Sequence, residues 1–418
     1  MQFGIRTLDE INVKGKTVLC RVDINQPVDR KTKTLKSIER IKACVPTVQE
    51  LSKKGAKVVL MAHQGSDIEY KNYYTTEPHS AVLSKLLDKE VKFIPDVCGP
   101  AAIEEIKSLK EGEILLLDNV RFMAEEQTLF EEKLNLSQEQ QAQTLLVRKL
   151  APLGDIYVCD AFAAAHRNQP SICGFEQILP SAMGRLFEKE YTVLSKLMQE
   201  TEHPCTFVLG GAKVSDAFLM LDTVLGRGIA DQIVTGGVVA NIFLIACEYH
   251  IGRGSYDFII KTNYGSYIEK AKEIYGKYKS KIFLPDDLAY VCSGERIEAS
   301  LKNVPETATI TDIGAKTIKK YQQVIRNSKT VFVNGPMGIF EDKLTENGTK
   351  EVWEALGDTS AYTVVGGGDS ITATTKFGKT NKISYICTGG GALMRFLTGE
   401  ELPAVKALRH GSRIPIKD

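Results

Sequence analysis

The sequence predicts an α/β protein with two lobes, each built on a parallel β-sheet. The first observation is length, because 418 residues are too many for one ordinary hydrophobic core and two domains are expected. The second is that short apolar strands alternate with helices, a pattern typical of parallel sheets covered on both faces. The third is the segment "GRLFEKEYTVLSKLMQE", about residues 184–200, which has the character of a connecting helix. We therefore expect two Rossmann-like lobes joined by a helical hinge.

Composition and charge limit the possible partners. The chain has 53 Lys and Arg against 52 Asp and Glu, so no overall field attracts nucleic acid or an anionic membrane. Nine cysteines stand singly without a Cys-x-x-Cys pair, which suits a reducing cytosol. The N-terminus lacks the apolar core of a signal peptide, and the longest uncharged run, residues 232–247, is shorter than a bilayer span of ~20 residues. We expect a cytoplasmic monomer, with a dimer as the alternative, and no nucleic-acid or membrane partner.

The first half opens with a strand, a helix and a second strand. Residues 18–25, "VLCRVDIN", begin as an apolar strand. Residues 37–55 place apolar side chains at helical spacing and finish with lysines and a glycine, a helix stop. Residues 57–62, "KVVLMA", and 114–122, "ILLLDNVRF", predict two further strands.

The remainder of this half continues the alternation. Ser137 and Gln140 form a capping-box pattern ahead of a helix that we expect to run through Leu150. Residues 155–162, "DIYVCDAF", predict another strand.

Four strands of this half end in polar side chains that could bind an anion. These side chains are Arg21, Asp23, Asn25, His63, Asn119, Arg121, His166 and Arg167. Open parallel sheets bind ligands outside the carboxyl ends of their strands, so these groups are expected at one edge, where Arg40 could join them. Each alone could be a satisfied or salt-bridged residue, and only their shared position favours an anion pocket.

Other histidines, the tryptophan and the strand cysteines give no such signal. His79, His203, His250 and His410 are expected at the surface. Trp353 is interpreted as helix packing, and Cys20, Cys159 and Cys387 as small buried hydrophobes.

The second half repeats one arrangement, an apolar strand followed by a glycine-rich turn. It occurs in "TFVLGGAKVSD", "QIVTGGVVAN", "TVFVNGPMG", "TVVGGGDS" and "ISYICTGGGA". Glycine lets a ligand approach the backbone, and the next helix N-terminus offers unpaired N–H groups to an anion. One such turn is ordinary turn chemistry, but five, with Lys213 and Asp369 among them, favour a nucleotide site. Lys213 would meet a phosphate, and Asp369 would hold Mg²⁺ together with phosphates.

Two common nucleotide signatures are missing, since neither G-x-x-x-x-G-K-[ST] nor a G-x-G-x-x-G after the first strand occurs. One half therefore suits a small polyanion and the other a nucleotide. This arrangement suits phosphoryl transfer, which depends on positioning and charge neutralisation.

The motifs resemble those of phosphoglycerate kinase from about Lys16 to Leu408. "RVDINQP", "DAFAAAHRNQPS", "LGGAKVSD", "NGPMGIFE", "GGGDS" and "TGGGA" are similar to the family's motifs and stand in the family's order. The "HQG" form around His63 and the "YYTT" at residues 73–76 look most like the archaeal-type branch.

The resemblance implies a hinge enzyme that interconverts 1,3-bisphosphoglycerate plus ADP with 3-phosphoglycerate plus ATP, using Mg²⁺. It implies a phosphoglycerate-binding lobe at residues 1–185, a nucleotide-binding lobe at 186–400 and a tail at 401–418 that returns to the first lobe. Substrate-binding positions would be Arg21, Asp23, Asn25, Arg40, His63, Gly65, Ser66, Arg121, His166 and Arg167. Nucleotide-binding positions would be Gly211, Lys213, Gly236, Gly237, Asn334, Pro336, Glu341, Gly367, Gly368, Asp369 and Ser370, and Asp369 would also ligate the metal. Catalytic positions would be Arg40, Lys213, Gly368 and Gly391, the last in a second glycine turn at residues 389–391.

Two positions depart from the family pattern. Ser66 and Asp67 stand where a basic residue and proline usually follow the histidine motif, so a phosphate contact is absent or supplied from elsewhere, with Lys71 as a candidate. Ala217 stands where many members carry a lysine, although archaeal-type members commonly lack it too. The alternatives are a catalytically silent nucleotide-binding relative and a kinase of another small phosphorylated acid. The retained Arg40, Lys213 and Asp369 favour the active enzyme.

Overall fold

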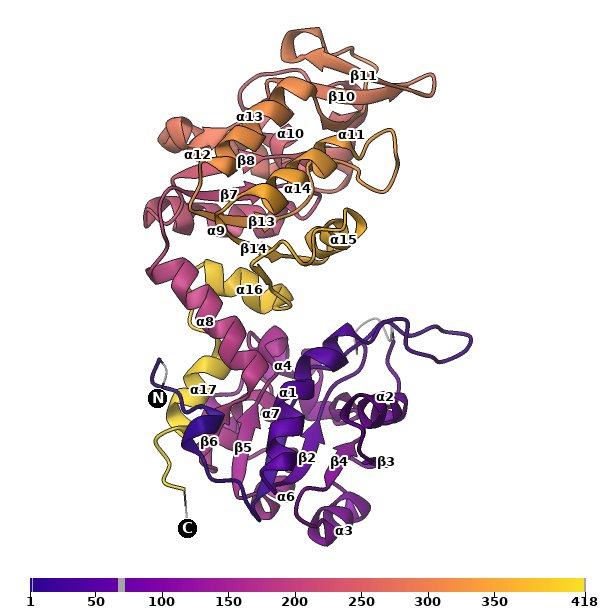
Figure 1. The fold of residues 1–418 in the computed structure, drawn as a ribbon, viewed down its shortest axis with the longest axis vertical. Coiled ribbons are helices and arrows are strands. Elements are labelled where there is room, and N and C mark those ends of the chain that lie inside the picture. The colour runs from indigo at the N-terminus through magenta and orange to yellow at the C-terminus, as the bar shows by residue number, and fades with distance from the viewer. Residues whose placement is uncertain (2, 67–71, 417–418) are drawn as a thin grey trace. The chain divides into compact units, whose positions relative to one another are not determined.

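The computed structural model describes residues 1, 3–66 and 72–416, which fall into two compact units (Figure 1). Unit 1 comprises Met1–Thr192 and Glu401–Asp418, and unit 2 comprises Val193–Glu400. Helix α8 (Arg185–Gln199) carries the chain from one unit to the other, which agrees with the predicted connecting helix. Each unit contains a six-stranded parallel sheet, so the predicted α/β fold class is confirmed.

The sheet of unit 1 has the strand order β3-β4-β2-β1-β5-β6. Its strands are β1 (Thr17–Arg21), β2 (Lys57–Met61), β3 (Val91–Ile94), β4 (Ile114–Leu117), β5 (Ile156–Cys159) and β6 (Ser181–Met183). Its helices are α1 (Glu39–Lys53), α2 (Glu77–Leu87), α3 (Pro100–Ser108), α4 (Thr128–Leu134), α5 (Gln138–Gln141), α6 (Leu145–Leu150), α7 (Pro170–Cys173) and α17 (Pro403–Gly411). All the strand pairs are parallel, so the carboxyl ends of β1, β2, β4 and β5 meet at one edge.

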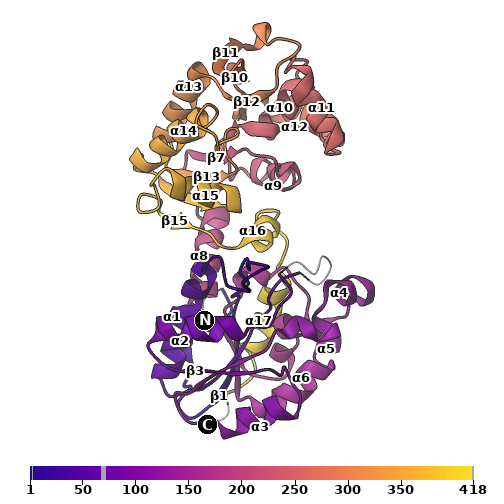
Figure 2. The ribbon, with the colours of Figure 1, turned by 90° about the vertical axis from the view of Figure 1, so that its right-hand side faces the viewer.

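Helices cover both faces of this sheet, as the turned view shows (Figure 2). On one face, Ile41 and Val48 of α1 pack with Val18 of β1 and Val58 of β2 in a single apolar cluster. The strands are buried on both faces because helices lie on each side, and this explains their continuous apolar sequences. The buried Cys20 and Cys159 belong to these strands, as expected.

The helix expected from Ser137 through Leu150 is two helices, so that prediction was wrong. The capping box is present, because Ser137 Oγ accepts from Gln140 N and Gln140 Oε1 accepts from Ser137 N. However, α5 ends at Gln141, and α6 restarts at Leu145. The carboxylate of Glu125 accepts hydrogen bonds from the backbone N–H groups of Leu145 and Leu146 and thereby caps a new helix start.

Unit 2 contains a second parallel sheet with the order β15-β14-β13-β7-β8-β9. Its strands are β7 (Cys205–Leu209), β8 (Gln232–Thr235), β9 (Ile282–Phe283), β13 (Thr330–Asn334), β14 (Tyr362–Gly366) and β15 (Tyr385–Ile386). Its helices are α9 (Val214–Gly226), α10 (Gly237–Ala246), α11 (Arg253–Lys261), α12 (Ser266–Tyr278), α13 (Ala315–Arg326), α14 (Asn347–Asp358), α15 (Gly368–Lys376) and α16 (Gly390–Leu397). The five strand-plus-glycine segments of the sequence form β7, β8, β13, β14 and β15, as predicted.

An antiparallel sheet that the sequence did not predict lies in the same unit, with the order β11-β10-β12. Its strands are β10 (Asp287–Cys292), β11 (Glu295–Ser300) and β12 (Ile310–Ile313). The core of unit 2 includes Trp353 of α14, whose indole N–H donates to Thr374 Oγ1 at 2.9 Å, so its interpretation as helix packing is confirmed.

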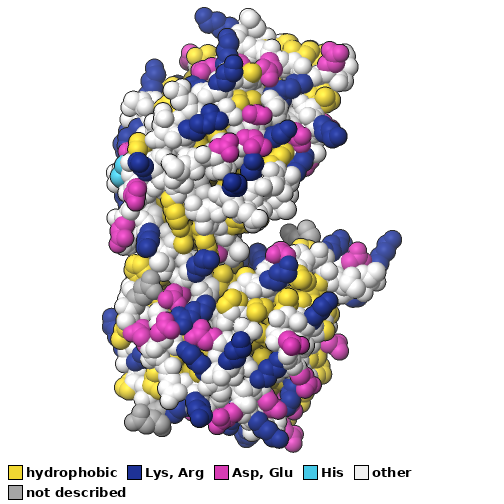
Figure 3. Space-filling model, in the orientation of Figure 1, with side chains coloured by type: hydrophobic (Ala, Val, Ile, Leu, Met, Phe, Trp, Pro, Cys, Tyr) yellow, Lys and Arg dark blue, Asp and Glu magenta, His cyan; other side chains and the backbone are white. Residues whose placement is uncertain are grey.

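Charged side chains of both signs are mixed over the face shown in Figure 3. This mixture agrees with the net charge of +1, so strong anion binding must come from local arrangements of charge. Within residues 1, 3–66 and 72–416, no helix has the length and apolar character needed to cross a bilayer.

Candidate functional site

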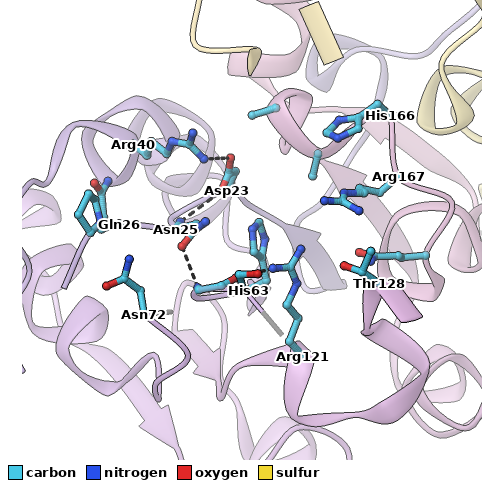
Figure 4. Close-up of a pocket in the computed structure, with 16 residues that line it drawn as sticks. Asp23, Asn25, Gln26, Arg40, His63, Asn72, Arg121, Thr128, His166 and Arg167 are labelled. Atoms are coloured by element: carbon cyan, nitrogen blue, oxygen red, sulfur yellow. Dashed lines mark hydrogen bonds and ion pairs between the residues drawn. The ribbon is translucent and has the colours of Figure 1, made fainter. Parts of the chain in front are cut away.

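A cavity of ≈ 500 Å³ opens at the carboxyl-end edge of the sheet in unit 1 (Figure 4). Nine of the ten predicted substrate positions line it: Asp23, Asn25, Arg40, His63, Gly65, Ser66, Arg121, His166 and Arg167. Sequence reasoning missed its other lining residues, Gln26, Pro27, Asn72, Thr128, Ala163, Ala164 and Gln169. The predicted Asn119 lies behind this surface, where it binds backbone groups. The shared position at strand ends therefore predicted a real pocket.

Arg40, at the start of α1, is held over the cavity by Asp23. Arg40 Nη1 donates to Asp23 Oδ2 at 2.7 Å, and the Arg40 side chain keeps 40% of its surface exposed while that of Asp23 keeps 4%. Asp23 Oδ1 accepts from Asn25 N at 3.2 Å, and Asn25 Oδ1 accepts from Gly65 N at 2.9 Å. The segment after β1 and the segment after β2 are thus tied together, and Arg40 remains free to meet a ligand on its open side.

Two further guanidinium groups, those of Arg121 and Arg167, stand on the other side of the cavity in the view of Figure 4. Arg121 follows β4 in η2 (Val120–Phe122), and its Nη1 donates to Gly65 O. Arg167 Nη1 lies 3.4 Å from Glu131 Oε2, and Glu131 also accepts from Asn168 N at 2.7 Å. Both cations are therefore positioned by neighbouring groups before any ligand binds.

His63 lies at the end of β2 among these arginines. Burial lowers the pKa of His63 well below its usual value, and the charges of Arg21, Arg121, Arg40 and Arg167 lower it further. The imidazole is therefore neutral at physiological pH and can donate one hydrogen bond to a ligand.

Arg21 is the predicted substrate position that does not line the cavity. Its side chain is 1% exposed, and its Nη2 lies 3.0 Å from Nδ1 of His63. Arg21 ends β1 with its side chain behind the histidine, so it contacts His63 and not the cavity surface.

Ser66 lines the cavity beside Gly65, whose carbonyl oxygen accepts from Arg121 Nη1. Gly65 has φ +82°, and a Cβ there would lie 2.0 Å from the carbonyl oxygen of Asn72, so this backbone conformation needs glycine. Asn72 Oδ1 accepts from Val28 N at 3.2 Å, which leaves its amide N–H groups as donors beside the cavity (Figure 4). Asp67 and Lys71, the other residues weighed at this position, lie outside the described residues.

Gln64 and His79 tie the loops of this edge together. Gln64 Nε2 donates to Gln26 O at 2.8 Å and to Asn72 O at 2.9 Å, and its Oε1 accepts from His79 Nε2 at 2.9 Å. The expectation that His79 is a surface residue was wrong, since it is fully buried and burial lowers its pKa to about 4. The local sequence contains no signal for this, because the partner of His79 lies on another loop. His203, His250 and His410 are exposed, as expected.

A second cavity, of ≈ 440 Å³, lies in unit 2 and is lined largely by apolar and glycine residues. Five predicted nucleotide positions line it: Gly211, Gly237, Pro336, Glu341 and Asp369. Apolar side chains from several elements, including Phe258, Leu288 and Met337, complete its wall and were not predicted. An apolar pocket with few polar groups is typical of a site for an aromatic base.

A smaller cavity shares Gly211 and Asp369 with it. Its wall includes the predicted Lys213, Asn334, Gly367, Gly368 and Ser370. Here Gly368 begins α15, and an added Cβ would meet nothing within 4 Å. The open space at a helix N-terminus fits an anion such as a phosphate.

Some glycines of these turns also allow close packing between neighbouring turns. A Cβ on Gly335 would lie 2.0 Å from Gly210 O, and a Cβ on Gly237 would lie 2.7 Å from Gly211 N. These glycines let the turns after neighbouring strands pack against each other. Gly236 has the same function against Met337, and it lines neither cavity.

Two further positions, Gly391 and Ala217, lie away from the cavity walls. Gly391 is in the first turn of α16 and lines none of the cavities described here. Ala217 is buried in α9, so its side chain does not reach either cavity of unit 2.

The described residues contain no cluster of three or more His, Cys, Asp or Glu side chains arranged to hold a metal ion. Asp369 stands alone at the junction of the two cavities, beside Lys213. Mg²⁺ is commonly held by one or two carboxylates together with substrate phosphates and water. A single carboxylate beside a lysine and the N-terminus of α15 fits that mode.

Comparison with known proteins identifies relatives over nearly the whole chain. The family model described as "Phosphoglycerate kinase" matches residues 8–400. Phosphoglycerate kinase of Methanothermobacter thermautotrophicus is 44% identical over 416 residues, with 99% of each chain covered. That of Methanobacterium bryantii is 43% identical over 408 residues, with 98% of each covered. Both relatives are archaeal, as the "HQG" and "YYTT" segments predicted.

Solved structures agree with this result. The crystal structure of phosphoglycerate kinase from Pyrococcus horikoshii superposes with a TM-score of 0.88 at 41% identity, covering 97% of this chain and 99% of that one. The structure of phosphoglycerate kinase from Coxiella burnetii gives a TM-score of 0.82 at 30% identity, covering 97% and 98%.

Proposed function

Because this chain belongs to the phosphoglycerate kinase family and catalyses its phosphoryl transfer to a carboxyl group, we propose that the unit 1 cavity binds 3-phosphoglycerate and the unit 2 cavities bind ATP or ADP. The γ-phosphoryl group of ATP passes to the carboxylate of 3-phosphoglycerate, giving 1,3-bisphosphoglycerate and ADP, and the reverse reaction restores ATP. No covalent intermediate with the protein is needed.

The charge of the unit 1 cavity is the observation from which we assign the acid substrate to it. Its lining contains three guanidinium groups, Arg40, Arg121 and Arg167, against one carboxylate, Asp23. Such a wall favours a small molecule with several negative charges, and guanidinium groups bind carboxylate and phosphate oxygens through paired donors. The neutral His63 supplies a donor without adding another charge.

Arg40 is assigned to the transferred phosphoryl group. The exposed side of the Arg40 guanidinium faces the cavity, and Asp23 holds the other side in place. A fixed cation of this kind stabilises charge that develops on the transferring oxygens. Arg121 and Arg167 are assigned to the phosphate that stays on the substrate.

The nucleotide is assigned to unit 2 by a similar argument. The apolar part of the larger cavity would hold the base, Glu341 would bind the ribose, and the N-terminus of α15 with Lys213 would bind the phosphates. Mg²⁺, held by Asp369 and the phosphates, would neutralise charge on the nucleotide when it is bound. Lys213 and Gly368, which line the smaller cavity, would lie near the transferred group, whereas the place of Gly391 rests on the family resemblance alone.

A cytoplasmic monomer is proposed as the working form. Most of the nine cysteines are buried, and none stands in a Cys-x-x-Cys pair, which suits a reducing compartment. Light scattering coupled to size-exclusion chromatography measures the oligomeric state directly, and a mass near twice 46.2 kDa would show a dimer instead.

The assignment is tested by measuring Mg²⁺-dependent ATP consumption with and without 3-phosphoglycerate. Strong stimulation by 3-phosphoglycerate, and weak stimulation by other small phosphorylated acids, is expected. Stronger stimulation by another acid would show that Ser66 has changed the substrate of the unit 1 cavity. Nucleotide binding without stimulation by any acid would overturn the assignment of that cavity.

A further inference from the structure

Each of the three guanidinium nitrogens of Arg21 contacts a group inside the protein, although Arg21 belongs to the same strand end as the substrate-facing residues. Its Nε donates to Ser171 Oγ at 3.0 Å, its Nη1 donates to Val22 O, and its Nη2 contacts His63 Nδ1 at 3.0 Å. With 1% of its surface exposed, it has no access to a ligand in the cavity. Any effect of Arg21 on the reaction must therefore pass through a neighbour.

The contact with His63 determines where the imidazole carries its proton. A guanidinium has only donors, so His63 Nδ1 must accept the hydrogen bond and cannot itself be protonated. The proton of the neutral ring is then on Nε2, for which the structure shows no partner among the described residues. Since His63 lines the cavity, Nε2–H is the group that it presents to a ligand.

A buried carboxylate holds Arg21 in place from the other side. Ser171 Oγ, which accepts from Arg21 Nε, donates to Glu126 Oε2 at 2.8 Å. Ser171 N donates to Glu126 Oε1 at 2.5 Å, so both oxygens of this carboxylate act as acceptors. Glu126 is fully buried in η3 (Ala124–Glu126), where burial raises the pKa of its carboxyl group while Arg21 and the Ser171 hydrogen bonds lower it, so this carboxyl group and the guanidinium stabilise each other.

We propose that Arg21 is a positioning residue that locks His63 in its neutral, Nε2-protonated form, and that Ser171 and Glu126 fix Arg21 for this purpose. The lock would give the acid substrate a donor of constant position and charge. Without it, the ring could turn or exchange tautomers, and some of those states would point an acceptor lone pair at a substrate oxygen. The proposal rests on the assignment of the unit 1 cavity to the phosphorylated acid.

The tautomer can be read directly from the ligand-free protein. The chain has six histidines, and ¹⁵N-histidine labelling with a His63→Gln variant identifies the His63 signals by their loss. We expect ¹⁵N shifts of a neutral ring protonated on Nε2 at both pH 6 and pH 8. The groups that face His63 and could compete are Asp23, Arg40, Arg121 and Arg167. An Nδ1-protonated or positively charged ring would overturn the proposal whether or not any variant folds.

A mutant cycle tests the kinetic consequence. Arg21→Lys keeps the charge but cannot reach both Ser171 and His63, and we expect the KM for 3-phosphoglycerate to rise about tenfold with a smaller change in kcat. In the His63→Gln background, the side-chain amide donates a hydrogen bond without a choice of tautomer. Adding Arg21→Lys to that variant should therefore change the KM for 3-phosphoglycerate little. Equal effects in both backgrounds would mean that Arg21 acts on general structure.

Failure of the cavity assignment would look different from failure of this inference. Adding 3-phosphoglycerate should shift the His63 signals if the acid binds there. An Nε2-protonated ring whose signals do not move, together with an unchanged KM in His63→Gln, would leave the tautomer correct and the cavity assignment wrong.

Discussion

Arg40 illustrates how a single side chain acquires a catalytic position. Replacing it with Ala should lower kcat by about two orders of magnitude, by analogy with the loss of one preorganised donor in a transition state. Steady-state turnover with saturating substrates measures this effect. Lys42→Ala is the matched control, because Lys42 lies on the same helix and pairs with Glu39 at the surface. Turnover close to that of the parent enzyme would refute the role given to Arg40.

Because Arg40→Ala also leaves the buried Asp23 without its ion pair, the stability of the variant must be measured beside its turnover. A loss of activity in a fully folded variant supports the catalytic role, whereas a loss that follows the folded fraction does not.

Ser66 is the second residue whose substitution is informative. Ser66→Arg should add a charge-assisted hydrogen bond worth roughly 1.5–3 kcal/mol to the phosphorylated acid, lowering its KM roughly ten- to a hundredfold. Initial rates at varied 3-phosphoglycerate concentration measure the change. Ser66→Gln adds length without charge and should have a smaller effect. An unchanged KM in Ser66→Arg would show that other donors, such as the amide of Asn72, already fill this position.

At the scale of residues, the sequence predicted which side chains lie near the cavity better than it predicted what each of them does there. His63, Arg121 and Arg167 could be placed at one edge because parallel strands end together. Arg21 obeys the same rule, yet its side chain turns inward, since the alternation of a strand and the distant Ser171 decide its direction. No local pattern contains that contact, which spans 150 residues of sequence.

At the scale of elements, the glycine turns of unit 2 hold the site by packing on one another. Gly335 has φ +99°, and an added Cβ would lie 2.0 Å from Gly210 O. Gly335→Ala should therefore lower the free energy of unfolding by about 3 kcal/mol or more, through backbone strain and a clash. Denaturant titration, followed by the fluorescence of unit 2 or by circular dichroism, measures this free energy of unfolding.

Gly228→Ala is the matched control for Gly335→Ala. Gly228 has φ +69° but open space around an added Cβ, so its substitution should cost only about 1 kcal/mol. Equal losses in the two variants would mean that the approach of the turns contributes nothing beyond the backbone angle.

The elements themselves were predictable where the signal was local. Apolar runs ahead of glycine turns predicted β7, β8, β13 and β14, because buried parallel strands need apolar side chains on both faces. The hairpin of β10 and β11 was missed, although Ser293 and Gly294 both have positive φ, as a two-residue hairpin turn requires. Its charged strand residues, such as Arg296 and Glu298, conceal the strand pattern, and Arg296 is held by the buried Asp312.

At the scale of the whole molecule, buried ionisable groups make stability depend on pH. Burial lowers the pKa of His79 to about 4 from the usual 6.5, so the folded protein binds fewer protons there than the unfolded chain between those values. Its contribution to stability is present above pH 6.5 and is lost as the pH falls through 4. His79→Gln should reduce the acid sensitivity of the free energy of unfolding across this range. An unchanged pH dependence between pH 4 and 6.5 would show that His79 is not neutral in the folded state.

The pKa shift of Asp160 has the opposite sign to that of His79. Asp160 lies where the chain leaves unit 1. Its Oδ1 accepts from Leu186 N at 2.9 Å and Phe187 N at 3.2 Å, at the start of α8, while Oδ2 has no partner among the described residues. The hydrogen bonds favour the anion, but burial outweighs them and raises the pKa of Asp160 to about 7 from 3.8. The folded protein therefore binds a proton that the unfolded chain has released between those values.

The contribution of Asp160 to stability is thus present below pH 3.8 and is lost as the pH rises through 7. Asp160→Asn mimics the protonated group and keeps an acceptor for the N-terminus of α8. Relative to the parent, the variant should be about equally stable near pH 4 and more stable by a few kcal/mol at pH 8. Free energies of unfolding at several pH values measure this divergence, with the exposed Glu39→Gln as a control for the loss of one charge. Parallel curves for parent and Asp160→Asn would mean that Asp160 is ionised in the folded protein and that an ordered water satisfies Oδ2.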